Sequence, residues 1–100
     1  VHAGASGVGV DAASRVKIEA AGRGDQYGHG LGHGVGIDVH ELPTLRAEST
    51  DTLETGNVVS IEPGLYVPGV GGVRIEDLVA VTTDGCEIFT HFTKELVEVG

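Results

Sequence analysis

The sequence is poor in residues that define several common protein classes. It has one cysteine, Cys86, and so no intrachain disulfide, which fits a reducing compartment. Six lysines and arginines stand against fifteen aspartates and glutamates, and the net charge of −9 leaves no basic surface for nucleic acid or an anionic membrane. No apolar run approaches a membrane span, and the first residues form no signal-peptide pattern. We expect a cytoplasmic protein that binds neither nucleic acid nor membrane.

Aromatic residues are also scarce, and glycine is abundant. Four aromatic side chains and 17 glycines in 100 residues predict a loop-rich fold with a thin core. The hydrophobic content of 40% nevertheless argues against disorder. We expect residues 1–100 to form a single small domain.

One helix is expected in the first quarter of the chain. Asp11 is a candidate N-cap for a helix over residues 12–21, because its carboxylate can accept from the free amides of the first turn. Gly22 and Gly24 end this helix, since glycine is favoured just past a helix C-terminus. Its modest apolar stripe is formed by Ala13, Val16 and Ala20. The small residues 1–10 form a weakly determined lead-in.

The second half of the chain favours short antiparallel strands. Residues 43–54 are polar and turn-like, with Leu45 and Leu53 as anchors. The expected strands cover residues 58–67, interrupted at Pro63-Gly64, and residues 73–82, which carry the strongest strand pattern. Glycines at 69, 71 and 72 mark the turn between them, and a short turn at Asp84-Gly85 leads into residues 87–91. We expect an antiparallel meander.

The stretch from residue 28 to residue 41 holds three of the five histidines. His29, His33 and His40 are spaced four and then seven apart, and glycine flanks the first two on both sides. A flexible loop with solvated histidines is one interpretation. Glu62 and Glu76, each within an otherwise apolar strand-like run, favour another, because a buried carboxylate must be paired, hydrogen-bonded or bound to a metal. Together these residues suggest a cation site.

Strand alternation predicts how the two glutamates are arranged. Ser60 and Glu62 share one face of their strand, and Arg74 and Glu76 share one face of the next. If the two strands pair antiparallel, both glutamates can converge on one polar face above an apolar underside packed on the helix. That is a carboxylate pair of the kind that metal sites use.

Three motifs in this order resemble those of a known family. They are His-Gly-Leu-Gly-His-Gly-Val-Gly-Ile-Asp-Val-His-Glu from residue 29, Ser-Ile-Glu-Pro-Gly-Leu-Tyr from residue 60 and Gly-Gly-Val-Arg-Ile-Glu-Asp-Leu-Val from residue 71. They are similar to the C-terminal signatures of the pita-bread metallopeptidases, and most similar to the branch of Xaa-Pro aminopeptidases and Xaa-Pro dipeptidases. The resemblance covers nearly the whole chain. It implies an α+β fold that is the C-terminal half of a pita-bread catalytic domain, an antiparallel sheet with a helix packed on one face.

The resemblance also implies roles for particular residues. His33, Glu62 and Glu76 match metal ligands, with Glu76 in the position that bridges two metals. The catalytic set comprises His40, which matches the histidine that contacts the scissile peptide group, and Glu62, His29 and Arg74. Glu62 is the candidate proton shuttle, while His29 and Arg74 match residues near the ligands or in the substrate site. His2 and His91 match nothing and are expected at the surface.

The implied cofactor is a divalent metal, and the implied substrate is a peptide with proline at the second position. One imidazole and hard carboxylates suit Mn, Co, Zn or Fe, with one or two ions in the full family site. Metal in such a site activates water for attack on the scissile peptide bond. The implied function is metal-dependent aminopeptidase or dipeptidase chemistry.

The chain departs from the family in one large respect. The first half of a pita-bread domain contributes two aspartate ligands, and upstream of His29 this sequence has only Asp11, Glu19 and Asp25 as acidic residues, none in an apolar strand-like run. Catalysis by this chain alone is therefore an open question. Three hypotheses remain: a piece of a metallopeptidase that needs its missing N-terminal half, an isolated or engineered half-domain that forms a homodimer and binds metal weakly, and a structural or interaction domain.

Overall fold

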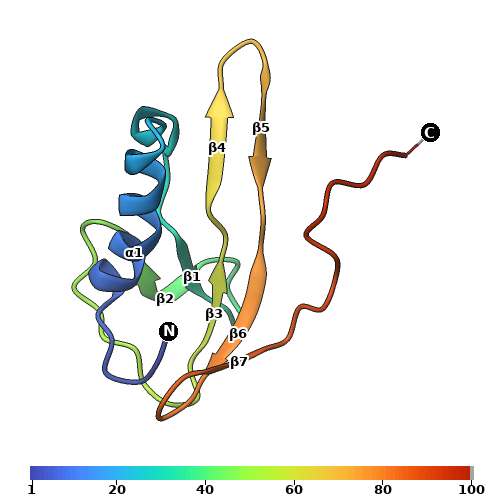
Figure 1. The fold of residues 1–100 in the computed structure, drawn as a ribbon. Helices are drawn as coiled ribbons and strands as arrows, with labels where there is room; N and C mark the ends of the chain where they lie inside the picture. Colours follow the sequence, from blue (N-terminus) through green and yellow to red (C-terminus); the bar gives the residue numbers. More distant parts are fainter. Residues whose placement is uncertain (100) are drawn as a thin grey trace.

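The computed structural model describes residues 1–99 and has an α+β architecture. One α-helix and a short 3-10 helix precede and partly cover seven strands that lie in two sheets (Figure 1). The elements in chain order are α1 (Gly7–Ala20), η1 (Gly24–Gln26), β1 (Gly32–Gly34), β2 (Glu41–Leu45), β3 (Val58–Ile61), β4 (Gly64–Val67), β5 (Gly71–Arg74), β6 (Asp77–Val81) and β7 (Cys86–Ile88).

The main sheet has five strands in the order β2-β1-β3-β6-β7, and all its neighbours pair antiparallel. β4 and β5 form a second, two-stranded sheet. Its register, Gly64 opposite Arg74, continues the register of β3 and β6, where Ile61 lies opposite Asp77. The two sheets are thus connected by one long hairpin that projects from the body of the molecule (Figure 1). The expected antiparallel arrangement of the second half is confirmed, including the interruption at Pro63. The single strand expected over residues 73–82 was wrong: residues 75 and 76 divide it into β5 and β6, and β5 begins at Gly71, within the expected turn.

The core lies between the main sheet, the N-terminal segment and α1. Six buried residues form it, and they come from the segment before β1, from β2, β3 and β6, and from the loop after β2: Leu31, Leu45, Leu53, Val59, Val79 and Val81. The expected anchors Leu45 and Leu53 are confirmed, at 0% and 1% exposure. The segment around them is more regular than expected, since its first residues belong to β2.

The helix begins five residues before its predicted start. Ser6 is the N-cap, and its hydroxyl oxygen accepts from the Gly9 amide at 3.1 Å. Glycine is needed at residue 7 because the helix approaches β2 closely there: a Cβ at this position would stand 2.0 Å from the Thr44 carbonyl oxygen. The prediction of a lead-in over residues 1–10, with Asp11 as the cap, was therefore wrong. The predicted end was correct, since Gly22 has a φ of +76° just past the last turn.

The predicted apolar stripe on this helix was also wrong. Val16 is 62% exposed, and Ala13 and Ala20 are exposed as well. The buried side carries Gly7 and the carboxylate of Asp11. Hydrophobicity alone could not reveal this face, because its central residue is a charged group that is stabilised by partners elsewhere in the fold.

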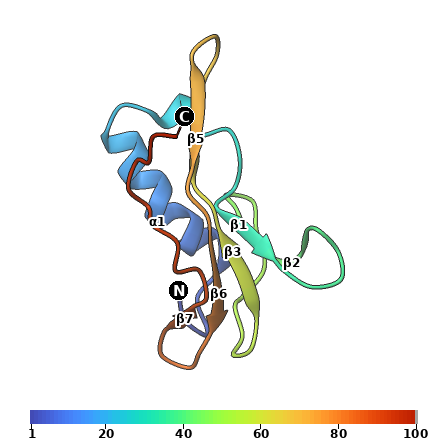
Figure 2. The ribbon, with the colours of Figure 1, turned by 90° about the vertical axis from the view of Figure 1, so that its right-hand side faces the viewer.

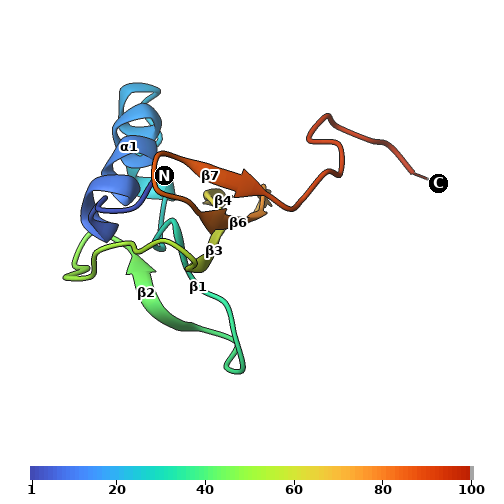
Figure 3. The same ribbon diagram turned by 90° about the horizontal axis from the view of Figure 1, so that it is seen from below.

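Figures 2 and 3 show the molecule from two further directions. α1 lies on one side of the strands, and the loop between β1 and β2 projects on the other side (Figure 2). Seen from below, the chain after β7 leads away from the helix (Figure 3). This last segment begins with a hydrogen bond from the Phe89 amide to the Leu78 carbonyl oxygen at 2.8 Å. Within residues 1–99, no helix is long and apolar enough to cross a membrane.

Candidate functional site

A cavity of about 520 Å³ lies where β1, β2 and the junction of β3 with β4 meet. Five of the six site residues expected from the sequence line this cavity, namely His29, His33, His40, Glu62 and Arg74. The histidines come from the segment around β1, the glutamate from the end of β3, and the arginine from the end of β5. Residues that are up to 45 positions apart in the sequence are thus gathered around one space.

His33 is held in β1 in a defined orientation. Its amide donates to the Ser60 hydroxyl at 3.2 Å, and its Nδ1 lies 2.9 Å from the Gly34 carbonyl oxygen. A carbonyl oxygen can only accept, so Nδ1 carries a proton, and Nε2 is the ring nitrogen left for a ligand. This is the arrangement in which a histidine binds a metal through Nε2.

Glu62 faces Nε2 of His33. Its Oε2 lies 3.4 Å from His33 Nε2, and both side chains are less than one-fifth exposed. Two ligand atoms that are each about 2.1 Å from a tetrahedral ion lie roughly 3.4 Å apart, so this separation fits two ligands of one cation. The backbone of Glu62 is held by its amide, which donates to the Leu31 carbonyl oxygen at 2.7 Å.

His40 lines the cavity next to His33. The two imidazole rings meet edge to face, with their centroids 4.3 Å apart and their planes at 62°. His40 is exposed, at the end of the loop that separates β1 from β2. A ring in this place is open to an incoming substrate and close to the candidate ligands.

His29 lies between two tyrosine rings. The centroids of Tyr27 and Tyr66 are each 5.6 Å from the centroid of its imidazole. His29 Nδ1 donates to the Gly30 carbonyl oxygen at 2.6 Å, and its buried Nε2 has no hydrogen-bond partner among the described residues. The site therefore contains a second imidazole whose Nε2 makes no hydrogen bond to the described residues.

Arg74 is one of two arginines that line the cavity, together with Arg46. Its interaction with Tyr66 is the largest cause that raises the pKa of Arg74, and the nearby charge of Glu62 raises that pKa further. Arg74 is therefore a permanent cation. It lies close to the surface, where it can contact an anionic group of a ligand.

Glu76 is the expected site residue that does not line the cavity. The antiparallel register places its backbone opposite that of Glu62, but it lies in a break between β5 and β6, where strand alternation does not apply. Glu76 is exposed and lines a separate hollow with the segment after β7. Among residues 1–99, no three His, Cys, Asp or Glu side chains form a cluster that could hold an ion. The structure therefore does not show the expected convergence of both glutamates.

Sequence reasoning missed several residues that organise this site. Ser60 is fully buried and accepts from His33, and Tyr66 contacts both His29 and Arg74. Asp11, which we expected to cap the helix, accepts from the Leu31 amide at 3.0 Å. The i,i+4 spacing of Asp11 and Arg15 was the one local signal, and it predicts a pair on the helix rather than a contact with the histidine segment.

The chain is similar to known proteins in both sequence and structure. The sequence profile of metallopeptidase family M24 matches residues 1–83. An Xaa-Pro dipeptidase of Lactobacillus delbrueckii subsp. lactis is 48% identical over 87 residues, which are 87% of this chain and 24% of that protein. The chain thus spans about a quarter of the length of such relatives.

Solved structures agree with this match. An Xaa-Pro dipeptidase from Bacillus anthracis superposes with a TM-score of 0.94 at 46% identity, over 97% of this chain and 27% of that one. A prolidase from Pyrococcus furiosus gives a TM-score of 0.91 at 39% identity, over 94% of this chain and 28% of that one. The α+β fold described above, an antiparallel sheet with one helix, is half of a pita-bread fold. The chain belongs to metallopeptidase family M24.

Proposed function

We propose that this chain is the C-terminal half of the catalytic domain of a divalent-metal-dependent Xaa-Pro peptidase, with residues 1–100 as one domain. The observation that carries the proposal is the His33–Glu62 pair, whose ligand atoms face one another at 3.4 Å across a cavity. The names of the relatives, Xaa-Pro dipeptidase and prolidase, support the substrate class, a peptide with proline at the second position.

His33 and Glu62 would hold the metal, and Glu76 would complete the set once its side chain turns toward Glu62 from the opposite strand. An imidazole with carboxylates suits Mn, Co, Zn or Fe, and one or two ions are compatible with these donor types. A bound divalent cation in such a site lowers the pKa of water and polarises a carbonyl group. The tautomer that the Gly34 carbonyl oxygen imposes on His33 leaves Nε2 free for this purpose.

The other cavity residues supply binding and proton transfer. Glu62 can hold and return a proton from its second carboxylate oxygen. His40, which lines the cavity, can donate to the oxygen of the scissile peptide group as negative charge develops there. Arg74 and His29 also line the cavity, where a cation and an imidazole nitrogen without a hydrogen-bond partner among the described residues can orient the substrate.

The incomplete ligand set decides what this chain can do alone. Two further ligands, expected from the N-terminal half of the fold, are needed for a second metal. We therefore propose that the chain binds one cation weakly and acquires full activity only with that half. The alternative is an isolated half-domain that binds metal and has little catalytic activity. It predicts the same weak metal binding, but no gain of peptidase activity when the N-terminal half is added.

Calorimetry with Mn²⁺ and Zn²⁺ tests the metal site directly. We expect saturable binding by the metal-free protein and its loss in the double variant Glu62→Ala, Glu76→Ala. A matched control is Glu54→Ala, Glu87→Ala, which removes two exposed carboxylates outside the cavity. Equal binding by all three proteins would contradict the assignment, and specific binding would justify an assay with an Xaa-Pro peptide.

The exposed apolar loop between β1 and β2 supports self-association. Ile37 and Val39 of this loop are 103% and 81% exposed, and Leu42 in β2 is 71% exposed, which is a costly arrangement in water. We propose a homodimer in which a second copy occupies the place of the missing half.

We also propose that the protein is cytoplasmic. The exposed thiol of Cys86, the single cysteine, fits the reducing environment of the cytoplasm.

A further inference from the structure

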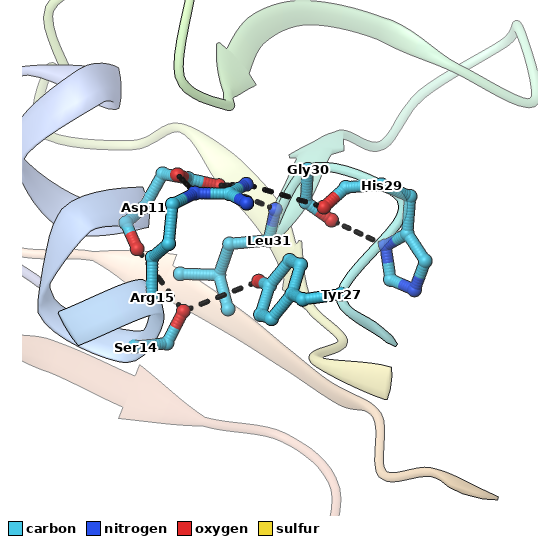
Figure 4. A network of polar contacts seen from close by, with 7 residues as sticks. All are labelled: Asp11, Ser14, Arg15, Tyr27, His29, Gly30 and Leu31. Carbon is cyan, nitrogen blue, oxygen red and sulfur yellow. Dashed lines mark hydrogen bonds and ion pairs between the residues drawn. The ribbon is translucent and has the colours of Figure 1, made fainter. Parts of the chain in front are cut away.

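Asp11 is a buried carboxylate that the proposed chemistry does not use. It is 1% exposed and lies within α1 rather than at its end. Its carboxylate accepts from Arg15 Nε at 2.8 Å, from Arg15 Nη2 at 3.2 Å and from the Leu31 amide at 3.0 Å (Figure 4). An i,i+4 ion pair that stabilised only its own helix could remain in solvent, where it would avoid the cost of removing a charge from water. The burial of Asp11 therefore indicates a role outside the helix.

Arg15 extends the same contact network to His29. Its Nη2 donates to the His29 carbonyl oxygen at 3.3 Å, and its guanidinium lies 4.4 Å from the centroid of the Tyr27 ring. The Tyr27 hydroxyl in turn lies 3.2 Å from the hydroxyl of Ser14 on the same helix. One face of α1 thus holds both the backbone of His29 and the ring that packs against its imidazole (Figure 4).

Leu31 connects this network to the glutamate side of the cavity. Its amide donates to Asp11, while its carbonyl oxygen accepts from the Glu62 amide at 2.7 Å. Its side chain is 3% exposed and belongs to the core. A displacement of the Leu31 backbone would therefore move Glu62 as well as the histidine segment.

We propose that Asp11 and Arg15 are positioning residues for the cavity, an assignment that rests on the function proposed above. Together they fix the backbone from His29 to Leu31, so that the His29 imidazole keeps its Nδ1–H donating to the Gly30 carbonyl oxygen and Glu62 stays opposite His33. Neither Asp11 nor Arg15 lines the cavity, so these residues act on the site through the backbone that they hold.

Two substitutions test the proposal. Arg15→Lys keeps a cation beside Asp11 but removes the planar fork that contacts the carboxylate and the His29 carbonyl oxygen at once. Asp11→Asn keeps the size of the side chain and removes its charge. The controls are Glu19→Gln, an exposed carboxylate on the same helix, and Val81→Ala, which lowers stability through the core at the other end of the main sheet.

Nitrogen-15 chemical shifts of the imidazole rings provide the first readout. We expect His29 in the unchanged protein to show the Nδ1–H tautomer, and both test variants to show a mixture of tautomers. Hydrogen exchange provides the second: protection of the Leu31 and Glu62 amides should fall about tenfold further than in Val81→Ala, because hydrogen bonds to charged groups are lost. A loss of overall stability alone would not change the tautomer of one ring.

Mn²⁺ affinity provides the third readout, and we expect it to fall by about tenfold in both test variants but not in Glu19→Gln. Unchanged tautomer and exchange in Arg15→Lys would overturn the proposal, even if Asp11→Asn failed to fold. If the unchanged protein bound no metal, the proposed function would fail. The first two readouts would still decide the role of the pair.

Discussion

Ser60 supports the candidate metal ligand His33 through a single hydroxyl group. It has no exposed surface, and its oxygen accepts from the His33 amide at 3.2 Å. Ser60→Ala leaves this amide without an acceptor in a buried place, which costs about 1 to 3 kcal/mol. We expect a lower free energy of unfolding in denaturant titration and weaker Mn²⁺ binding by calorimetry.

The control for this prediction is another serine that accepts a backbone hydrogen bond. Ser6→Ala removes the cap of α1, away from the cavity, and should lower stability by about 1 kcal/mol. Its Mn²⁺ affinity should be unchanged. If both variants lost metal binding equally, Ser60 would affect the site only through overall stability.

Asp51 gives the protein a component of stability that depends on pH. Its Oδ2 accepts from the Thr44 amide and from the Thr44 hydroxyl, both at 2.8 Å. These two hydrogen bonds, the backbone one first, hold the pKa of Asp51 below its ordinary value. The group protonates less readily in the folded than in the unfolded protein, so it stabilises the fold at neutral pH. This contribution is lost as the pH falls through the lowered pKa.

We therefore expect Asp51→Asn to be less stable than the unchanged protein at neutral pH. The difference should shrink as the pH falls below the ordinary carboxyl range, because the unchanged protein loses the same interaction there. Denaturant unfolding at a series of pH values measures this, with the exposed Asp84→Asn as the control. A difference that grew toward acid pH would have the wrong sign for this mechanism.

At the scale of elements, the contact between β1 and β3 brings the two halves of the site together. β1 carries His33, and Glu62 follows β3 directly. The two strands approach so closely that a Cβ on Gly32 would stand 1.8 Å from the Ser60 carbonyl oxygen. Any side chain at residue 32 must therefore separate the strands or distort one of them.

Gly32→Ala should lower the free energy of unfolding by about 1 to 3 kcal/mol or more, through overpacking between β1 and β3. It should also weaken Mn²⁺ binding, because His33 and Glu62 move apart. Gly28→Ala is the matched control, since a Cβ there meets nothing within 4 Å and the residue does not have a positive φ. Equal stability of the two variants in thermal unfolding would show that β1 can shift at little cost.

At the scale of the whole molecule, the apolar loop between β1 and β2 predicts self-association. Light scattering at micromolar concentration should give the mass of a dimer for the unchanged protein. Ile37→Asp, Val39→Asp should give the mass of a monomer, because two fully exposed apolar side chains are lost from the proposed contact. Val70→Asp, at the tip of the β4–β5 hairpin, is the control and should remain dimeric. A monodisperse monomer of the unchanged protein would exclude the dimer.

Much of the architecture could be predicted because it depends on local patterns. The alternation of residues 58–67 and 73–82, with a proline in the first run, predicts two antiparallel strands and the break between β3 and β4. Leu45 and Leu53 stand out as apolar residues in a polar stretch, and both are core residues. The histidine spacing and Glu62 indicated four of the residues that line the cavity, and Arg74 was indicated by the third motif. Glu76 was expected there as well but does not line the cavity.

The sequence by itself determined the family, the antiparallel strands of the second half and the types of group available to a metal. Only the tertiary structure decided which groups meet. Asp11 accepts from an amide 20 residues away, and the Gly34 and Gly30 carbonyl oxygens select the tautomers of two histidines. Glu76 lies outside the cavity because the chain leaves strand geometry between β5 and β6. Sequence periodicity describes neighbours within one element, whereas hydrogen bonds between elements depend on how these elements pack.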